Sequence, residues 1–366
     1  MGKPRKLIGA AAAIAVTAAA ALVWATSAGT GAAAGLADYR PQTRLEGTLR
    51  ISGNDKMQGM LQALENGFVK YQPGLRFTSW LTGTASGMYG LEMRTADLAA
   101  MGRAINPFER YGTYERSWTY PVEIEIATGN LGKPHLSDPL AIFVQKDNPL
   151  TQLTLKQVDG IFGAQRGGGW KALSWDEASA RPASDDIRRW SQLGQQDAPI
   201  HVYGPPILGA GTISFFQARV MGGGAMWNPQ LREYGDRRQM LEDLAHDPQG
   251  IAYAPLSYAT AGVKPLALAE EGQFFLPDPQ SVQSRQYPLA RPVYLTFTID
   301  NVHSEIADPR IDPKVREFLN FVLSRQGQEI VAKQGDFLPL NTNVVARQMQ
   351  LLDASGTPPE RDLLGD

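Results

Sequence analysis

Cysteine is absent from the 366-residue chain, and histidine occurs only four times. The absence of cysteine excludes disulfides, cysteine–zinc sites, iron–sulfur clusters and thiol nucleophiles. The four histidines lie far apart and form neither an H-x-x-H nor an H-E-x-x-H pattern, so the sequence predicts no metal site. Any chemistry at a site must therefore come from oxygen atoms, nitrogen atoms and the backbone.

A strong charge of either sign is also missing. Thirty-five lysines and arginines oppose 37 aspartates and glutamates, which gives a net charge of -2. This balance lacks the basic footprint that nucleic-acid binding needs, so we expect no nucleic-acid partner. Hydrophobic residues make up 43% of the chain, which is enough for a large core and for two domain-sized units.

Beyond the first 28 residues, no stretch of 18 residues is apolar enough to suggest a membrane span. The beginning of the chain differs, because three cations in residues 1–6 precede an uncharged, alanine-rich run at residues 7–24. This order is typical of a secretory signal peptide, predicted over residues 1–28 with cleavage after Ala25 or Ala28. The alternative is an uncleaved anchor. We therefore expect a periplasmic or secreted protein.

The rest of the chain alternates short apolar runs with helical patterns, which is typical of βαβ units in an α/β protein. Residues 29–45 are expected to be a mobile tether and residues 346–366 a polar tail. Residues 164–196 are interpreted as a surface excursion. Apolar residues at helical spacing predict one helix over residues 315–333. Strands are predicted at residues 48–52, 75–81, 96–101, 141–144, 200–203, 250–253 and 293–299.

Four turns share one design, in which a strand ends, small or polar residues follow, and a helix begins. They lie at residues 53–56, 82–87, 102–103 and 209–214. Backbone N–H groups at a helix start attract anions, and the helix dipole contributes about 0.3–1 kcal/mol at each. Lys56 and Arg103 would add charge-assisted hydrogen bonds. The alternative is that these residues only form turns and helix caps.

Signals of an enzyme are weak. The serine within residues 83–87 stands one place late for a G-x-S-x-G elbow, and the glycine-rich residues 163–171 lack the G-K-[ST] order of a phosphate loop. The adjacent acids at residues 176–177 and 185–186 are interpreted as solvated surface. We therefore expect a protein that is not an enzyme and has no cofactor. The alternative is an exported phosphoesterase, which needs a metal cluster or an activated nucleophile.

Taken in order, the motifs resemble the solute-binding proteins of phosphate ABC transporters, and the match runs from about residue 48 to 340. Three segments look like the family's first three anion loops: ISGNDKM at 51–57, GTASGM at 83–88, and ADLA at 96–99 followed by Gly102 and Arg103. The most specific marks are NPL at 148–150 with LTL at 153–155, IF at 161–162, and GAGT at 209–212 with Phe216. GIAY at 250–253, YPL at 287–289 and residues 321–327 complete the series.

The resemblance implies a two-lobed periplasmic-binding-protein fold with a ligand cleft between the lobes. Lobe 1 is expected at residues 46–149 and 290–345 and lobe 2 at residues 150–289, with crossings near residues 145–154 and 287–293. The implied partners are a small oxyanion, with phosphate first, and an ABC permease, and the protein is expected to be a monomer. The implied ligand-binding residues are Asn54, Asp55, Lys56, Thr84, Ala85, Ser86, Arg103, Gly211, Thr212 and Ser214.

The sequence departs from the family pattern within these loops. Asn54 and Lys56 replace Ser and Thr, Gly102 stands where a Ser often precedes the arginine, Ala210 replaces a Ser, and Pro206 lies where an Arg is common. Hydrogen bonds to charged groups contribute roughly 1.5–3 kcal/mol each, so these changes are enough to weaken phosphate binding or to change the ligand. Another oxyanion, a phosphorylated or carboxylated small molecule, and a ligand-free sensing role remain alternatives.

Overall fold

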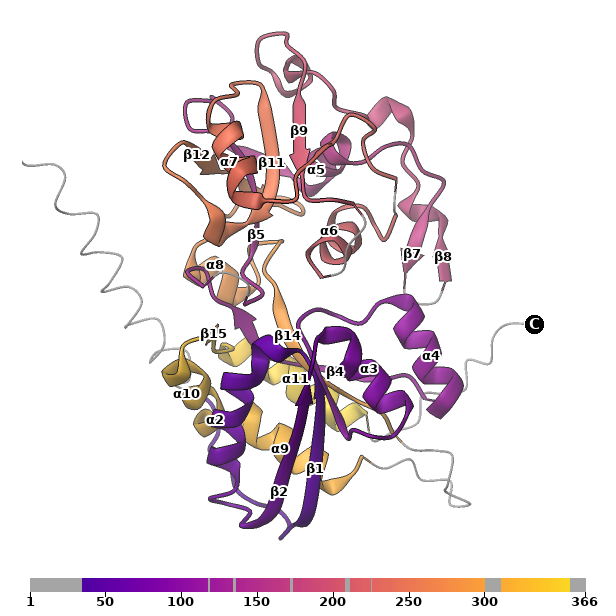
Figure 1. The fold of residues 1–366 in the computed structure, drawn as a ribbon, viewed down its shortest axis with the longest axis vertical. Helices are drawn as coiled ribbons and strands as arrows, with labels where there is room; N and C mark the ends of the chain where they lie inside the picture. The colour runs from indigo at the N-terminus through magenta and orange to yellow at the C-terminus, as the bar shows by residue number, and fades with distance from the viewer. Residues whose placement is uncertain are drawn as a thin grey trace, which may run out of the picture.

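The structure, a computed structural model, describes residues 35–117, 119–133, 136–171, 174–207, 211–224, 226–299 and 311–355. In this part the chain forms two lobes, each built around one sheet, with α6 of one lobe facing α4 of the other (Figure 1). The predicted signal peptide lies outside the described residues. No helix within them is long and apolar enough to cross a membrane.

The first lobe contains a six-stranded sheet with the order β15-β4-β14-β3-β1-β2. The strand β1 pairs in parallel with β2 and β3, whereas β14 is antiparallel to β3 and β4. Parallel strands end at the same edge, so the turns after β1, β2 and β3 are neighbours. The elements are β1 (Glu46–Gly53), η1 (Asp55–Met57), α2 (Gln58–Phe68), β2 (Gly74–Leu81), α3 (Thr84–Glu92), β3 (Leu98–Met101), α4 (Pro107–Ser117), β4 (Val122–Gly129), β14 (Pro292–Phe297), α9 (Pro313–Leu323), α10 (Arg325–Gln334), β15 (Phe337–Leu338) and α11 (Thr342–Ala354).

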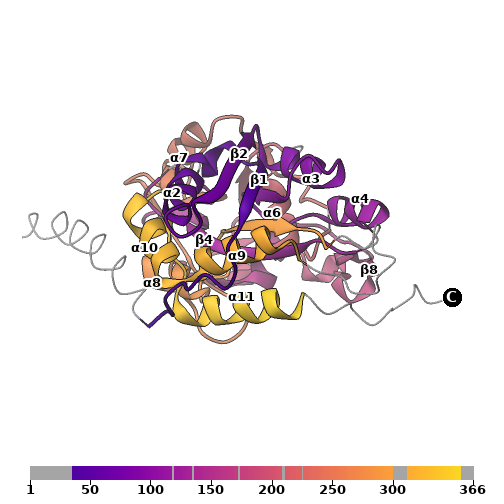
Figure 2. The same cartoon turned by 90° about the horizontal axis from the view of Figure 1, so that it is seen from below.

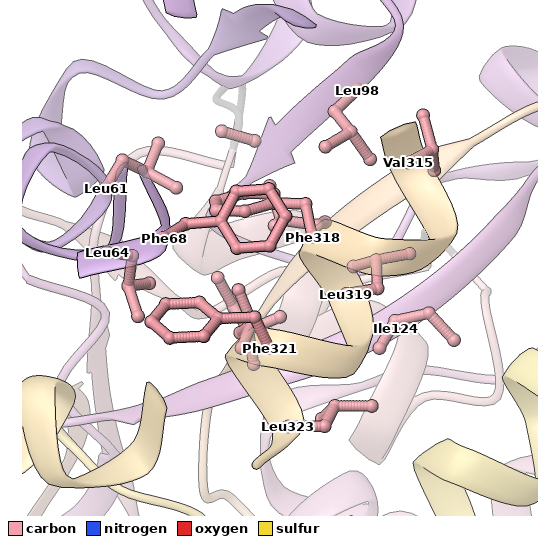
Figure 3. Close-up of a cluster of buried hydrophobic side chains, with 14 of the residues drawn as sticks. Leu61, Leu64, Phe68, Leu98, Ile124, Val315, Phe318, Leu319, Phe321 and Leu323 are labelled. Carbon is pink, nitrogen blue, oxygen red and sulfur yellow. The ribbon is translucent and has the colours of Figure 1, made fainter. Parts of the chain in front are cut away.

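The core of this lobe lies between the sheet and helices α2 and α9 (Figure 3). The apolar residues of α2 repeat at helical spacing, and Leu61, Leu64 and Phe68 are fully buried. The ring of Phe68 lies with its centroid 5.3 Å from those of both Phe318 and Phe321. The amphipathic pattern thus fixes which face of α2 packs inward.

The second lobe contains a five-stranded sheet with the order β10-β9-β11-β5-β12, and two small sheets pair β6 with β13 and β7 with β8. Its core includes Phe216 and Tyr253, whose ring centroids lie 4.1 Å apart. The elements are β5 (Leu140–Gln145), β6 (Gln152–Thr154), α5 (Leu155–Phe162), β7 (Gly169–Lys171), β8 (Ser174–Asp176), η2 (Glu177–Ser179), η3 (Ala183–Asp185), η4 (Trp190–Leu193), β9 (His201–Gly204), α6 (Thr212–Val220), β10 (Arg232–Glu233), α7 (Arg237–Ala245), β11 (Gly250–Pro255), η5 (Leu256–Tyr258), β12 (Val263–Pro265), β13 (Ala267–Ala269) and α8 (Pro279–Ser284).

The predicted boundary between the lobes at residue 149 is wrong. The strand β5, assigned from the sequence to lobe 1, pairs with β11 and β12 in the second sheet. The first crossing therefore lies between the end of β4 at Gly129 and the start of β5 at Leu140, ahead of the predicted residues 145–154. A buried apolar run shows that a strand is present but not which sheet it joins. The second crossing lies between α8 and β14.

The predicted tether and tail are both too long. Within residues 35–45, Tyr39 is buried, and its hydroxyl donates a hydrogen bond to the Glu317 carboxylate at 2.6 Å. At the other end α11 continues to Ala354 with Leu352 fully buried, and Figure 2 shows this helix along one side of the molecule, next to α9. The buried residues of α11, which include Val344, Gln348 and Leu352, follow helical spacing across the predicted boundary at residue 345, and this pattern was missed.

Two further expectations need correction. The single helix predicted over residues 315–333 is two helices, because Ser324 ends α9 and its side chain caps α10 by accepting from the Gly327 N–H. The residues interpreted as a surface excursion, 164–196, bury Trp190 and Arg181. Within them Asp186, read from the sequence as solvated, pairs with Arg181 at 2.7 Å. Isolated buried residues in a polar segment leave no pattern in the sequence.

Candidate functional site

Three predicted loops of the first lobe meet around Gly102. The Asn54 N–H donates to the Ala100 carbonyl at 2.9 Å, and the Gly83 N–H donates to the Gly53 carbonyl at 2.9 Å. A Cβ atom built on Gly102 would lie 2.0 Å from Asn54 Nδ2 and 3.2 Å from Thr84 Oγ1. The parallel strands β1, β2 and β3 thus bring these loops into contact, as the sequence predicts.

Two departures from the family pattern are coupled by this packing. The Asn54 side chain is almost fully buried, and its Oδ1 accepts from the Lys56 N–H at 2.9 Å, which caps η1. No acceptor for its Nδ2 is found among the described residues. The amide occupies the space that a side chain at residue 102 would need. Glycine at position 102 is therefore required by asparagine at position 54, and the Asn54 amide supplies a donor there.

Lys56 lies on the exposed surface. Its side chain is 53% exposed, and its Nζ pairs with the carboxylate of the adjacent Asp55 at 2.9 Å. Neither residue lines the cavity between the lobes that is described below. The ammonium that we expected to carry counter-charge for a ligand is therefore neutralised by its neighbour and directed to solvent.

This placement leads to a prediction that differs from the expectation based on the sequence. Lys56→Met should leave the affinity for an anion within about twofold of the parent, because an exposed ion pair contributes little. Isothermal titration calorimetry of the variant and the parent measures the difference. A tenfold loss of affinity would show that Lys56 reaches the ligand after all.

The second loop keeps one hydroxyl free. The helix α3 begins at Thr84 after Gly83, whose φ of 134° requires glycine. The Ser86 hydroxyl is used within the turn, where it donates to the Gly83 carbonyl at 2.8 Å, and Ala85 is exposed. The Thr84 hydroxyl makes no hydrogen bond in the part of the chain that the structure describes. Thr84 is therefore better placed than Ser86 to donate to a ligand.

Arg103 is buried and held rigidly. Its side chain is 8% exposed and forms two hydrogen bonds of 2.7 Å with the Glu109 carboxylate. Nη1 also donates to the Ala104 carbonyl at 2.9 Å. The buried Nε has no partner among the described residues. Glu109 compensates much of the charge of Arg103, and Nε is left buried without an acceptor.

The fourth loop, at residues 209–214, lies in the second lobe. The helix α6 begins at Thr212, as predicted, and its N-cap is Gly211 with a φ of 72° and no side-chain cap. The Thr212 hydroxyl therefore does not cap the helix, and within the described residues it has no hydrogen bond. Gly209 and Ala210 lie outside the described residues. Thr212 offers a free hydroxyl at a helix start.

A comparison with a helix-capping threonine of the same lobe tests whether the Thr212 hydroxyl binds the ligand. Thr212→Ala should weaken anion binding by about tenfold or more, the effect of losing one hydrogen bond to a charged group, and leave the melting temperature of the unliganded protein nearly unchanged. The control is Thr154→Ala, because Thr154 caps α5 in a capping box. That variant should lose about 0.5–2 kcal/mol of stability and keep its affinity. The reverse pattern in titration and thermal unfolding would remove Thr212 from the site.

A cavity of about 760 Å³ lies between the lobes. Of the ten residues predicted to bind the ligand, it brings together Arg103 and Ser214. Asn54 and Thr84 do not line the cavity themselves, but their side chains lie beside Gly102, which does. Other lining residues come from the loop before α4, from α6 and from the segment that returns to the first lobe, including Ile105, Phe108, Glu125, Trp170, Phe215, Arg219, Arg285, Tyr287, Arg291, Tyr294 and Arg347.

The sequence analysis missed Arg291, which directly precedes β14. Its side chain is 8% exposed, and its Nε has no partner in the described part of the chain. Burial away from water lowers the pKa of this guanidinium to about 10. Nη1 reaches only the Asp138 carbonyl, at 3.5 Å. A lone arginine before a strand carries no motif, so no sequence signal marks it.

Arg291 and Arg103 lie at the same edge of the sheet. The strand β14 runs antiparallel to β3 with Tyr294 opposite Met101, so the start of β14 is next to the end of β3. Five arginines and the single carboxylate of Glu125 line the cavity, and two of these arginines, Arg103 and Arg219, also pair with carboxylates outside the lining. Arg285 neutralises the Glu125 carboxylate at 2.8 Å. The cavity is therefore suited to an anion.

A metal centre finds no support in the described residues, which contain no group of three histidine, aspartate or glutamate side chains that could hold an ion. His135 and His303 lie outside them.

Comparisons with known proteins show where the chain belongs. A family model described as a PBP superfamily domain matches residues 38–326. The phosphate-binding protein PstS of Pseudomonas aeruginosa is 28% identical over 340 residues, which cover 89% of this chain and 95% of that protein. Protein SphX of Synechococcus elongatus is 24% identical over 295 residues, covering 79% of this chain and 76% of the relative.

Solved structures show the same fold. PstS from Borrelia burgdorferi has a TM-score of 0.55 at 19% identity and covers 81% of this chain and 100% of that one. An ABC-type phosphate transport receptor from Vibrio cholerae has a TM-score of 0.50 at 20% identity and covers 79% and 99%. These matches confirm the two-lobed fold and the resemblance to phosphate-transporter binding proteins. Since the family model spans most of the chain, including every strand of both large sheets except β15, the chain belongs to the PBP superfamily.

Proposed function

We propose that this protein is an exported solute-binding protein that captures phosphate or a related oxyanion between its lobes and delivers it to an ABC importer. The observation that carries the proposal is the pair of buried guanidinium groups of Arg103 and Arg291, which both line the cavity between the lobes and each have an unpartnered Nε. The names of the relatives, which describe phosphate binding and transport, support the same ligand class.

Burial of the Arg103 and Arg291 guanidinium groups costs free energy in the unliganded protein. Burying an ionised group without full hydrogen bonding is expensive, and an unsatisfied buried donor costs about 1–3 kcal/mol. Arg291 has no carboxylate within ion-pairing distance among the described residues. An oxyanion in the cavity would accept hydrogen bonds from these two guanidinium groups and compensate the charge of Arg291. The unliganded protein therefore carries a buried charge that lacks full compensation, and a bound anion supplies it.

Closure of the lobes gives the mechanism. The Asn54 amide and the Thr84 hydroxyl belong to the first lobe, while Thr212 and Ser214 begin α6 of the second. A ligand that contacts both sets of donors binds the closed form more tightly and shifts the population towards it. This process needs no covalent step. The protein would act as a monomer. Its proposed export is based on the signal peptide predicted at residues 1–28.

The rival function, a phosphoesterase, is addressed by the chemistry of the cavity. Hydrolysis of a phosphoester requires a metal ion or an activated nucleophile. Among the lining residues that the structure describes, the one carboxylate, that of Glu125, is engaged by Arg285. We therefore expect no turnover of a generic phosphoester, and a colorimetric assay with such a substrate checks this directly.

The direct test is calorimetric. We expect the exported protein to bind at least one anion of a panel of phosphate, sulfate, phosphonates and small carboxylates, with 1:1 stoichiometry. Neither heat nor a thermal shift for any member of the panel would favour a ligand-free role in sensing or surface interaction.

A further inference from the structure

The cavity between the lobes is much larger than a bare oxyanion. Its volume is about 760 Å³, whereas a water molecule occupies about 30 Å³ in the liquid and a four-oxygen anion is only a few times larger. Cavities of this size ordinarily hold organic molecules. The space therefore exceeds what the two buried arginines need for a phosphate group.

Five aromatic residues line the cavity. Phe108 at the start of α4 belongs to the first lobe, Trp170 and Phe215 belong to the second, and Tyr287 and Tyr294 flank the second crossing. Phe108 is 79% exposed, although it is a large apolar side chain at the mouth of a cationic cavity. An exposed apolar surface adds no binding free energy for a bare phosphate ion, whereas an apolar group of a ligand bound there would shield the aromatic surface from water.

The cationic and aromatic parts of the wall adjoin each other. The guanidinium carbon of Arg291 lies 5.7 Å from the centroid of the Phe215 ring. A ligand whose anionic head meets Arg291 thus places its next atoms beside that ring. Phe108 of α4 and Phe215 of α6 both line the cavity, from opposite lobes, so closure of the lobes would bring them around the same group.

We propose that the preferred ligand is an organic phosphate, a monoester or phosphonate whose anionic head binds Arg103 and Arg291 and whose apolar or aromatic substituent packs between Phe108 and Phe215. This inference rests on the proposed function, because the same arginines hold the head group. It names the class of substrate for that site.

Titration of the dialysed protein with inorganic phosphate and with phenyl phosphate tests the inference. Phenyl phosphate should bind at least about tenfold more tightly, because its ring is removed from water. Phe108→Ala should reduce the affinity for phenyl phosphate about three- to tenfold and leave that for inorganic phosphate within twofold. The control, Tyr111→Ala, removes a 54% exposed aromatic residue of the same helix that does not line the cavity, and should change neither affinity.

The outcomes separate the two proposals. Binding of inorganic phosphate that is as tight as or tighter than that of phenyl phosphate would overturn the organic-phosphate inference and keep the proposed function. Binding of neither probe would overturn the organic-phosphate inference, and the absence of binding for every member of the anion panel would overturn the proposed function as well. A preference for phenyl phosphate that survives both Phe108→Ala and Phe215→Ala would overturn the assigned position of the substituent.

Discussion

Arg291→Met should weaken anion binding by about 10- to 150-fold while leaving the unliganded protein as stable as the parent or more so. A hydrogen-bonded guanidinium is worth about 1.5–3 kcal/mol to a bound anion. In the unliganded protein, however, the Arg291 charge is buried with an unpartnered Nε, and an apolar side chain of similar volume avoids that penalty. Titration calorimetry and thermal unfolding measure the two quantities on the same samples.

The control for this variant is Arg316→Met, which removes a partly exposed arginine of α9 whose 3.5 Å ion pair with Asp353 lies outside the cavity lining. Its affinity should equal that of the parent. Arg291→Lys should lose part of the affinity, since it keeps the charge but not the planar fork of donors. If Arg291→Met lowers the melting temperature and binds the anion normally, the residue supports the fold and the anion lies elsewhere.

Gly102→Ser should impair both binding and stability, and Asn54→Ser should restore them in the double variant. A Cβ atom at position 102 would lie 2.0 Å from Asn54 Nδ2, so the amide must leave its position, at a cost typical of overpacking, about 1–3 kcal/mol. Shortening residue 54 frees that space, and the new hydroxyl supplies the donor that the amide had supplied. The pair should therefore show a coupling free energy of about 1 kcal/mol or more.

A double-mutant cycle on the parent, both single variants and the double variant measures this coupling for affinity and for unfolding. Gly87→Ala is a useful comparison, because its Cβ would lie 3.1 Å from atoms of Ala99 and Met101 and 3.3 Å from the backbone of Gly53, and near neither Asn54 nor Gly102. This variant measures the effect of an added methyl group next to the site, while the donors at residues 54 and 84 stay unchanged. Additive effects of the two serine substitutions would contradict the proposed exchange of donors.

The local elements followed from the sequence because they depend on local patterns. Apolar residues at helical spacing predicted which face of α2 is buried, and the change from a strand to small residues to a helix predicted the start of α6. The helix α3 begins at Thr84, within the turn predicted at residues 82–87, so its start was predicted too late. The ordered series of motifs gave the family and the two-lobed fold. These signals lie within short stretches of chain, so one sequence is enough to read them.

The tertiary structure decided how these pieces combine. It assigned β5 to the second sheet, since strand partnership depends on residues more than 100 positions away. It directed Lys56 to solvent, although the sequence had placed that residue in the site. It brought Arg291 to the edge of the sheet where Arg103 lies, from nearly 190 positions further along the chain. The sequence by itself determined the fold family and the class of donors, whereas only long-range packing determined which charges are buried beside the cavity.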